Sequence, residues 1–277
     1  MKKGIYIAVI VLLAITLVVS GIYLFNYFWE GKKEADRYQQ LANIVQESRQ
    51  ETETTAASDP SASSEPTETA EFIPDPDNLD PEEGFPAIPD YKQLKQMNSD
   101  FVGWISIEGT KLNYPVMQTS VNNANYYLYR NFDKENSTRG SVYVREQCDV
   151  YKPSDNVTLY GHTMKDGSMF ACLHDYVDKK AWDNNPLIFF DTTEEYHVYK
   201  IFSVFKTSAN LGEGFSYHKF ENAANQQEFD NFVATCKKLA FYDTGITPVY
   251  GDKLICLSTC EYSLDNGRLV VAAVRII

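Results

Sequence analysis

The order of apolar and polar residues divides the chain into four stretches. The first, residues 4–29, contains no charged residue and is longer than the roughly 20 residues that a helix needs to cross a bilayer. The second, residues 30–50, is rich in helix-forming residues and places Leu41, Ile44 and Val45 at helical spacing. We therefore expect a membrane-spanning helix over 4–29 and a juxtamembrane helix over 30–50.

The alternative for the first stretch is a cleaved signal peptide. Such a peptide has an apolar core of about 7–15 residues and ends in a small-x-small site, whereas this run is longer and no Ala-x-Ala pattern closes it. Aromatic residues at its far end suit a membrane interface. Because Lys2 and Lys3 precede the span, the positive-inside rule places residues 1–3 in the cytoplasm and the rest of the chain outside the cell.

The third stretch, residues 51–89, is dominated by Glu, Asp, Ser, Thr and Pro and contains no Lys or Arg. Such a composition buries too little apolar surface to offset the entropy of ordering, so we expect an extended tether. Most of the net charge of −13 belongs to this stretch. The remainder is nearly neutral and has no basic stripe, which argues against nucleic-acid binding.

The fourth stretch, residues 90–277, has the texture of a globular domain. Short apolar or alternating runs, each bounded by Gly, Pro, Asn or Asp, predict strands at 103–117, 140–146, 156–162, 186–192, 196–207, 252–258 and 268–277. Helices are expected at 90–101, 167–179 and 225–241. Many strands without a βαβ rhythm predict a mainly β fold, a closed or nearly closed β-barrel with peripheral helices.

The five cysteines need separate explanations. Cys256 and Cys260 are four residues apart in one strand-like run, so their Cα atoms would be roughly 13 Å apart, which is beyond disulfide reach. Cys172 and Cys236 fall in predicted helices and suit small core positions. Cys148 suits a loop or strand end. There is no Cys-x₂-Cys pair and the four histidines are dispersed, so we expect neither a metal site nor a cofactor.

Cys260 could be a core residue or a nucleophile. A nucleophilic thiol needs a proton-transfer partner and a group that stabilises the developing oxyanion. His162 follows a strand-like run and is a candidate for the first role. Arg268 opens the next strand and could either donate to the oxyanion or hold a substrate carbonyl. The alternatives are a surface histidine and a solvated arginine.

Several blocks of the chain resemble sortases. LSTC (257–260) is similar to the family's signature around its nucleophilic cysteine, and the conserved His, Cys and Arg fall in order on His162, Cys260 and Arg268. YGHTMKDGSMF (160–170), together with blocks near 103–118, 125–132 and 140–144, resembles class B sortases, the membrane-anchored cysteine transpeptidases of Gram-positive bacteria. The resemblance covers roughly residues 90–277.

The resemblance implies an eight-stranded sortase barrel and a reaction. Cys260 would attack the Thr–Gly or Thr–Asn bond of a C-terminal sorting signal similar to Leu/Asn-Pro-x-Thr-Gly/Asn and form a thioacyl link to the threonine. His162 would protonate the departing amine, and Arg268 would stabilise the oxyanion or the substrate backbone. The partners would be sorting-signal-bearing surface proteins or pilins, with an amine of a peptidoglycan precursor or a pilin as acceptor.

By family position, four further residues could contact the substrate: Ser258, Leu128, Thr207 and Phe215. Ordinary barrel-wall or loop packing is the alternative for each of them. Two other functions stay open: a class B sortase that polymerises pili, and a tethered extracellular domain that binds without catalysis.

One local signal conflicts with the catalytic interpretation. If Asn266 and Gly267 formed a two-residue hairpin, Asp265 would pair with Arg268 and Cys260 would face Ala273. The thiol would then lie roughly 17 Å from the backbone of Arg268. The sortase resemblance therefore requires an irregular loop over residues 261–267.

Overall fold

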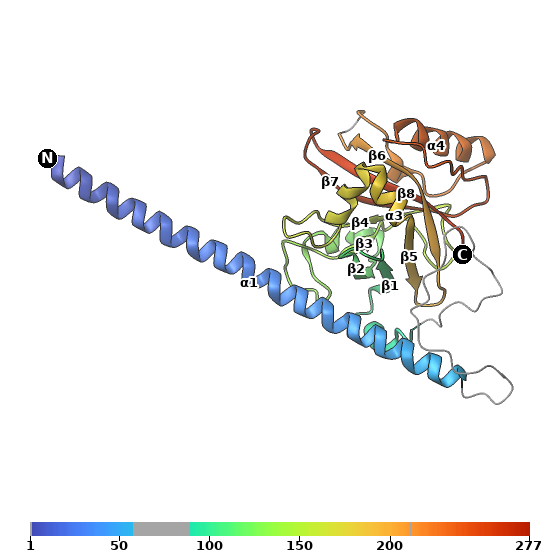
Figure 1. The fold of residues 1–277 in the computed structure, drawn as a ribbon, viewed down its shortest axis with the longest axis horizontal. Coiled ribbons are helices and arrows are strands. Elements are labelled where there is room, and N and C mark those ends of the chain that lie inside the picture. Colours follow the sequence, from blue (N-terminus) through green and yellow to red (C-terminus); the bar gives the residue numbers. More distant parts are fainter. Residues whose placement is uncertain (1, 58–88, 211) are drawn as a thin grey trace. The chain divides into compact units, whose positions relative to one another are not determined.

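The computed structural model describes residues 2–57, 89–210 and 212–277 (Figure 1). Helix α1 runs over Lys2–Ala57, so the predicted membrane-spanning and juxtamembrane segments belong to one helix. Residues 51–57 of the predicted tether form the end of α1, and residues 58–88 of it lie outside the described residues. The chain divides into two compact units, Met1–Asn43 and Ile44–Ile277.

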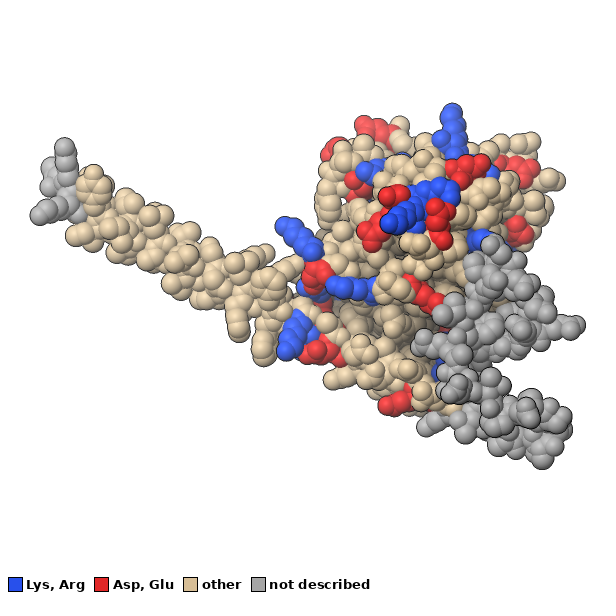
Figure 2. Space-filling model, viewed as in Figure 1, with Lys and Arg blue, Asp and Glu red and all other residues tan. Residues whose placement is uncertain are grey.

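The first unit carries the apolar section of α1. Its large apolar side chains between Ile5 and Phe25 are exposed, and Figure 2 shows no charged side chain along this section. Within the described residues, α1 is the one helix that is long and apolar enough to cross a membrane. The predicted membrane-spanning segment is therefore helical, and its exposed surface is apolar, as contact with lipid requires.

In the second unit, eight strands close into a barrel in the order β1-β2-β3-β4-β7-β8-β6-β5. The strands are β1 (Phe101–Ser106), β2 (Asn113–Met117), β3 (Val142–Val144), β4 (Asn156–Tyr160), β5 (Leu187–Thr192), β6 (Val198–Ser208), β7 (Leu254–Glu261) and β8 (Gly267–Arg275). The β2–β3 and β4–β7 pairs are parallel and the others antiparallel. The predicted closed barrel of eight strands is confirmed.

Helices lie around this barrel (Figure 1). The α-helices are α2 (Lys92–Met97), α3 (Lys179–Asn184) and α4 (Gln226–Leu239), and the 3₁₀-helices are η1 (Val121–Asn123), η2 (Tyr126–Tyr129), η3 (Ala171–Val177) and η4 (Tyr217–Lys219). The side chain of Asn225 caps α4 by accepting from the backbone N–H of Glu228 at 3.1 Å.

Two sequence-based expectations about elements were wrong. The alternating run over 103–117 is a hairpin of β1 and β2 and not one strand, because the chain turns at Gly109, whose φ of +68° suits glycine. The helix expected over 167–179 is replaced by η3 and α3. Its start is prevented by Met169, which has φ +59° and pairs with Thr163 in an isolated bridge.

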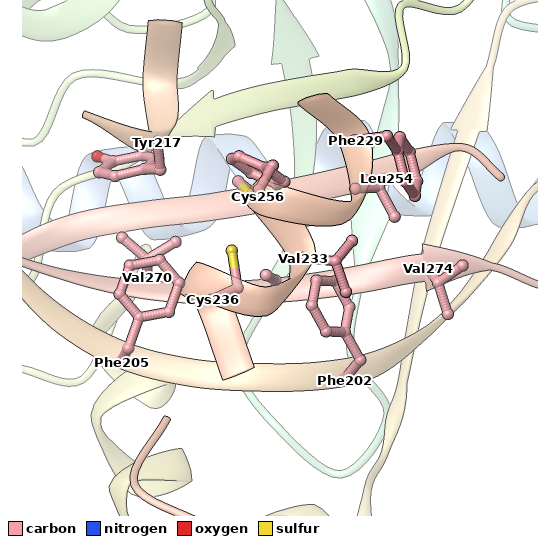
Figure 3. Close-up of a cluster of buried hydrophobic side chains, with 12 residues drawn as sticks. Phe202, Phe205, Tyr217, Phe229, Val233, Cys236, Leu254, Cys256, Val270 and Val274 are labelled. Atoms are coloured by element: carbon pink, nitrogen blue, oxygen red, sulfur yellow. The ribbon is translucent and has the colours of Figure 1, made fainter. Parts of the chain in front are cut away.

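The face of the sheet beneath α4 leads to the site. Phe229, Phe232, Val233 and Cys236 of α4 pack in one cluster with Cys256 of β7 and with side chains of β6 and β8 (Figure 3). Because side chains alternate along a strand, Ser258 and Cys260 continue the face that Cys256 presents to this cluster. Burial falls along the row, since Cys256 and Ser258 are buried and Cys260 is partly exposed.

Candidate active site

Cys260 and Arg268 are direct partners in the β7–β8 ladder. The ladder ends one pair later at Glu261 and Gly267, so residues 262–266 form the connection and no two-residue hairpin exists at Asn266-Gly267. Directly opposed residues have Cβ atoms about 4.5–5.5 Å apart and point to the same face. The irregular loop that the catalytic interpretation requires is therefore present.

Contacts to distant parts of the chain hold this loop open. Lys206 of β6 donates to Glu261 Oε1 at 2.9 Å and to Ser263 Oγ at 3.1 Å. Asn210, beyond β6, donates to Asp265 Oδ2 at 2.9 Å. These partners lie 55 or more residues from the loop in the sequence, so a pattern of neighbouring residues could not predict them.

Arg268 lies between two strands of the barrel. It pairs with Cys260 on one side and with Thr207 of β6 on the other. Its guanidinium Nη1 donates to the backbone carbonyls of Gly267, at 2.8 Å, and Asn266, at 3.3 Å. The guanidinium is thereby held at the strand end, with its other N–H groups available as donors.

His162 follows the strand that flanks β7 on its other side. Tyr160 of β4 pairs in parallel with Ser258, and the next backbone N–H, of Gly161, donates to Ser258 O at 3.2 Å. Extended two residues past the end of β4, this register would place His162 opposite Cys260 and on the same face. The backbone carbonyl of His162 accepts from the N–H of Phe170 at 2.9 Å, which fixes the turn after the strand.

The imidazole of His162 has a defined partner. Its Nε2 atom lies 2.8 Å from the backbone carbonyl oxygen of Leu128, and the ring of Tyr129 is tilted against it with centroids 5.6 Å apart. Since a carbonyl oxygen only accepts, Nε2 carries the hydrogen of this bond. The neutral imidazole is then the Nε2–H tautomer, and Nδ1 is its proton acceptor.

The predicted substrate contacts lie in different environments. Ser258 is buried, and its Oγ is 2.5 Å from the hydroxyl of Tyr217, whose pKa is raised by burial to about 12. Thr207 Oγ1 accepts from the backbone N–H of Phe215 at 2.7 Å. The Phe215 ring packs in the cluster beneath α4. Leu128 reaches the site through its carbonyl.

The other four cysteines are held as thiols. Burial raises the pKa of Cys172 to about 11. It also raises the pKa of Cys148, Cys236 and Cys256. All five cysteines are unpaired, and no group of three or more potential metal ligands occurs among the residues that the structure describes.

Sequence reasoning missed the hydrogen bond between Thr163, which follows His162, and Thr259, which precedes Cys260. Thr163 Oγ1 lies 2.8 Å from Thr259 Oγ1 and 2.9 Å from His174 Nε2. Thr163 stands inside the block YGHTMKDGSMF, but a hydroxyl beside a histidine gives no sign of its partners. The contact to Thr259 spans 96 positions of sequence.

Comparison with known proteins identifies the family. Residues 105–276 match the family model described as "Sortase domain". Sortase B of Staphylococcus aureus (strain NCTC 8325 / PS 47) is 32% identical over 187 residues, which cover 67% of this chain and 74% of that protein.

Two solved structures are similar over nearly the whole length. A Staphylococcus aureus sortase B-substrate complex has a TM-score of 0.69 at 26% identity, covering 90% of this chain and 98% of the other. A sortase B complexed with triglycine has a TM-score of 0.68 at 25% identity, covering 89% and 98%. Sortases are cysteine transpeptidases. On the family match and these relatives, the chain belongs to the sortase family, in its class B.

Proposed function

We propose that this protein cleaves a C-terminal sorting signal similar to Leu/Asn-Pro-x-Thr-Gly/Asn and transfers the threonine carbonyl to an amine outside the cell. The observation that carries the proposal is the direct pairing of Cys260 with Arg268. His162 follows the neighbouring strand β4, two residues after its last pair with β7. A nucleophile, a proton carrier and a cationic donor thus share one face at one end of the barrel.

In the first half-reaction the thiolate of Cys260 attacks the threonine carbonyl carbon, with its proton held at Nδ1 of His162. The Leu128 carbonyl keeps the other ring nitrogen as a donor, which orients Nδ1 toward the proton transfer. The guanidinium of Arg268 donates to the oxyanion or to the adjacent substrate carbonyl. The C–N bond then breaks, His162 protonates the departing amine, and a thioester remains on Cys260.

In the second half-reaction an acceptor amine attacks the thioester carbon. His162 takes a proton from the attacking nitrogen, the C–S bond breaks, and Cys260 leaves as thiolate. The thioester conserves the energy of the cleaved amide, so transfer needs no further energy source. The solved sortase B with triglycine supports an amino group of a peptide as acceptor.

We further propose that residues 4–29 anchor the enzyme, with residues 1–3 in the cytoplasm and residues 90–277 outside, joined by the tether over 51–89. The exposed apolar surface of α1 supports the anchor. Lys2 and Lys3 support the orientation. Substrate proteins brought to the same membrane surface would then meet an active site held near it.

Three measurements test this function. The full-length protein in detergent micelles is mixed with a library of quenched fluorescent peptides of the pattern above and with triglycine. We expect one subset to be cleaved, a product with triglycine joined to the threonine to form, and mass spectrometry to find the acyl group on Cys260. The variant Cys260→Ala should cleave nothing, and Cys172→Ala, which removes the other partly exposed thiol, should cleave normally.

The results also separate the alternatives. Cleavage by Cys260→Ala would remove Cys260 from the mechanism. Binding of the peptides without cleavage would favour the non-catalytic domain. Transfer to a pilin lysine but not to a peptidoglycan-type amine would favour the pilus-polymerising sortase.

A further inference from the structure

The residues on either side of His162 and Cys260 share a chain of hydrogen bonds. Thr259 Oγ1 lies 2.7 Å from Gly161 O, and Thr163 Oγ1 lies 2.8 Å from Thr259 Oγ1. His174 Nε2, on η3, lies 2.9 Å from Thr163 Oγ1. We call these three contacts the Thr163 chain. Gly161 and Thr163 flank His162, and Thr259 precedes Cys260.

The direction of the Thr163 chain follows from counting protons. Gly161 O is a carbonyl and can only accept, so the single hydroxyl proton of Thr259 is used there. The contact between the two threonines then requires the proton of Thr163, since its other acceptor, Cys260 O, is at the longer distance of 3.5 Å. The contact to His174 must therefore use a hydrogen on His174 Nε2. This arrangement supplies one proton to each of the three contacts.

The Thr163 chain lies behind the site and not in it. Thr259 alternates with Ser258 and Cys260 along β7, so its side chain points to the opposite face of the sheet. Thr259 is buried, with 2% of its surface exposed. No group of the chain therefore needs to contact the substrate in order to act.

The geometry points to Thr163 and His174 as positioning residues, which fix the spacing between His162 and Cys260. β4 ends at Tyr160, and the backbone bond from Gly161 to Ser258 carries its pairing with β7 one residue further. Beyond this backbone bond, side-chain contacts of the Thr163 chain join the residues after β4 to the end of β7. His174 of η3 makes the last contact of the Thr163 chain, so the start of the loop after His162 is bonded to the helix that follows the loop. Small displacements of reacting groups lower turnover strongly.

This inference rests on the proposed function, and its test uses two hydroxyl variants in the full-length protein. Thr163→Val keeps the shape of the side chain and removes the hydroxyl. We expect it to lower kcat on a cleaved sorting peptide about tenfold, with KM changed less than twofold, because the substrate surface is intact. Thr163→Ser restores the hydroxyl and should recover most of kcat. Thr235→Val, which removes a hydroxyl that donates to Asn231 O within α4, is the matched control.

A second pair of variants tests His174 independently and covers the case in which Thr163→Val does not fold. His174→Gln keeps a terminal N–H donor, and His174→Leu removes it. We expect His174→Gln to retain more of kcat than His174→Leu. Equal kcat in these two variants, or a Thr163→Val enzyme as fast as wild type, would overturn the inference.

A third measurement does not depend on activity. Two-bond ¹H–¹⁵N spectra of histidine-labelled protein report which ring nitrogen carries hydrogen, and we expect the Nε2–H tautomer for His174 in the wild type and its loss of preference in Thr163→Val. An Nδ1–H tautomer in the wild type would overturn the chain. If wild-type protein cleaves no peptide, the proposed function fails while the tautomer still decides the Thr163 chain.

Discussion

The catalytic candidate His162 is oriented by a main-chain atom, because its Nε2 lies 2.8 Å from the carbonyl oxygen of Leu128. The direction of a backbone carbonyl is set by the backbone around it, so the direction of the Leu128 carbonyl depends on the position of η2. Asn125 precedes η2 in a left-handed conformation (φ +57°), and its Oδ1 accepts from the hydroxyl of Tyr143 at 3.0 Å. The carbonyl that fixes the histidine is thus itself fixed by β3.

The first prediction concerns this hydroxyl. Tyr143→Phe should lower kcat about threefold to tenfold and the free energy of unfolding by about 1 kcal/mol, since one hydrogen bond is lost. Both are measured on the full-length protein, by peptide cleavage and by urea unfolding. Tyr242→Phe loses a comparable bond, to Tyr176 O at 2.9 Å, without contact to η2. Equal effects of the two variants on kcat would refute the link to His162.

The second prediction concerns the space that the Leu128 carbonyl occupies. Gly140 has φ +58°, and a Cβ there would lie 2.4 Å from Leu128 O and 2.6 Å from Tyr127 O. A non-glycine residue at such a φ costs roughly 1 kcal/mol of stability. Gly140→Ala should in addition lower kcat, because the new Cβ displaces the Leu128 carbonyl. Gly245→Ala has the same backbone cost (φ +76°) but meets nothing within 4 Å. The two variants should differ in kcat, and similar kcat values would argue against displacement of the carbonyl.

The third prediction concerns Arg268, the ladder partner of Cys260. Arg268→Met should reduce kcat about 10²–10³-fold, the usual cost of removing an oxyanion donor. Arg268→Lys keeps the charge but not the planar fork, so an intermediate loss is expected. Arg275→Met, at the other end of β8, is the control. Near-normal kcat in Arg268→Met would show that Arg268 is a solvated arginine at a strand end without a role in catalysis.

The sequence predicted the barrel because that signal is local, and the catalytic roles of His162, Cys260 and Arg268 stay predictions. Alternating runs give strands, and LSTC and the run before His162 place their residues at strand ends. The β7–β8 connection was harder. Asn266-Gly267 favours a tight turn, and the structure has an open loop because Lys206 and Asn210 hold Glu261 and Asp265 from distant segments.

The hydrogen-bond partners of the candidate residues could not be predicted either, because they also come from distant segments of the chain. Leu128 was predicted to contact substrate, and the structure gives it a further contact, because its carbonyl oxygen lies 2.8 Å from His162 Nε2. Any residue type supplies a backbone carbonyl, so the identity of residue 128 does not predict this role. The contact of Thr163 with Thr259 joins two segments that are adjacent only after β4 and β7 pair.

The last prediction concerns Asp191, a carboxyl of β5 that is 4% exposed. Burial raises its pKa to about 6, although Arg49 of α1 lies 3.2 Å from it and Tyr91 donates to it at 2.9 Å. Because the folded pKa is above the unfolded value near 4, the folded state binds more protons between these values. The penalty for the buried charge is present above pH 6 and is lost as the pH falls toward 4.

Wild type should therefore gain stability relative to Asp191→Asn when the pH is lowered from 7 to 4, by as much as about 3 kcal/mol for a pKa difference of two units. The comparison cancels the titration of all other groups, which both proteins share. Urea unfolding of the full-length protein at several pH values measures it. Asp230→Asn, at an exposed position of α4, should show no such trend. A stability difference between wild type and Asp191→Asn that stays constant with pH would show that Asp191 titrates as it does in the unfolded chain.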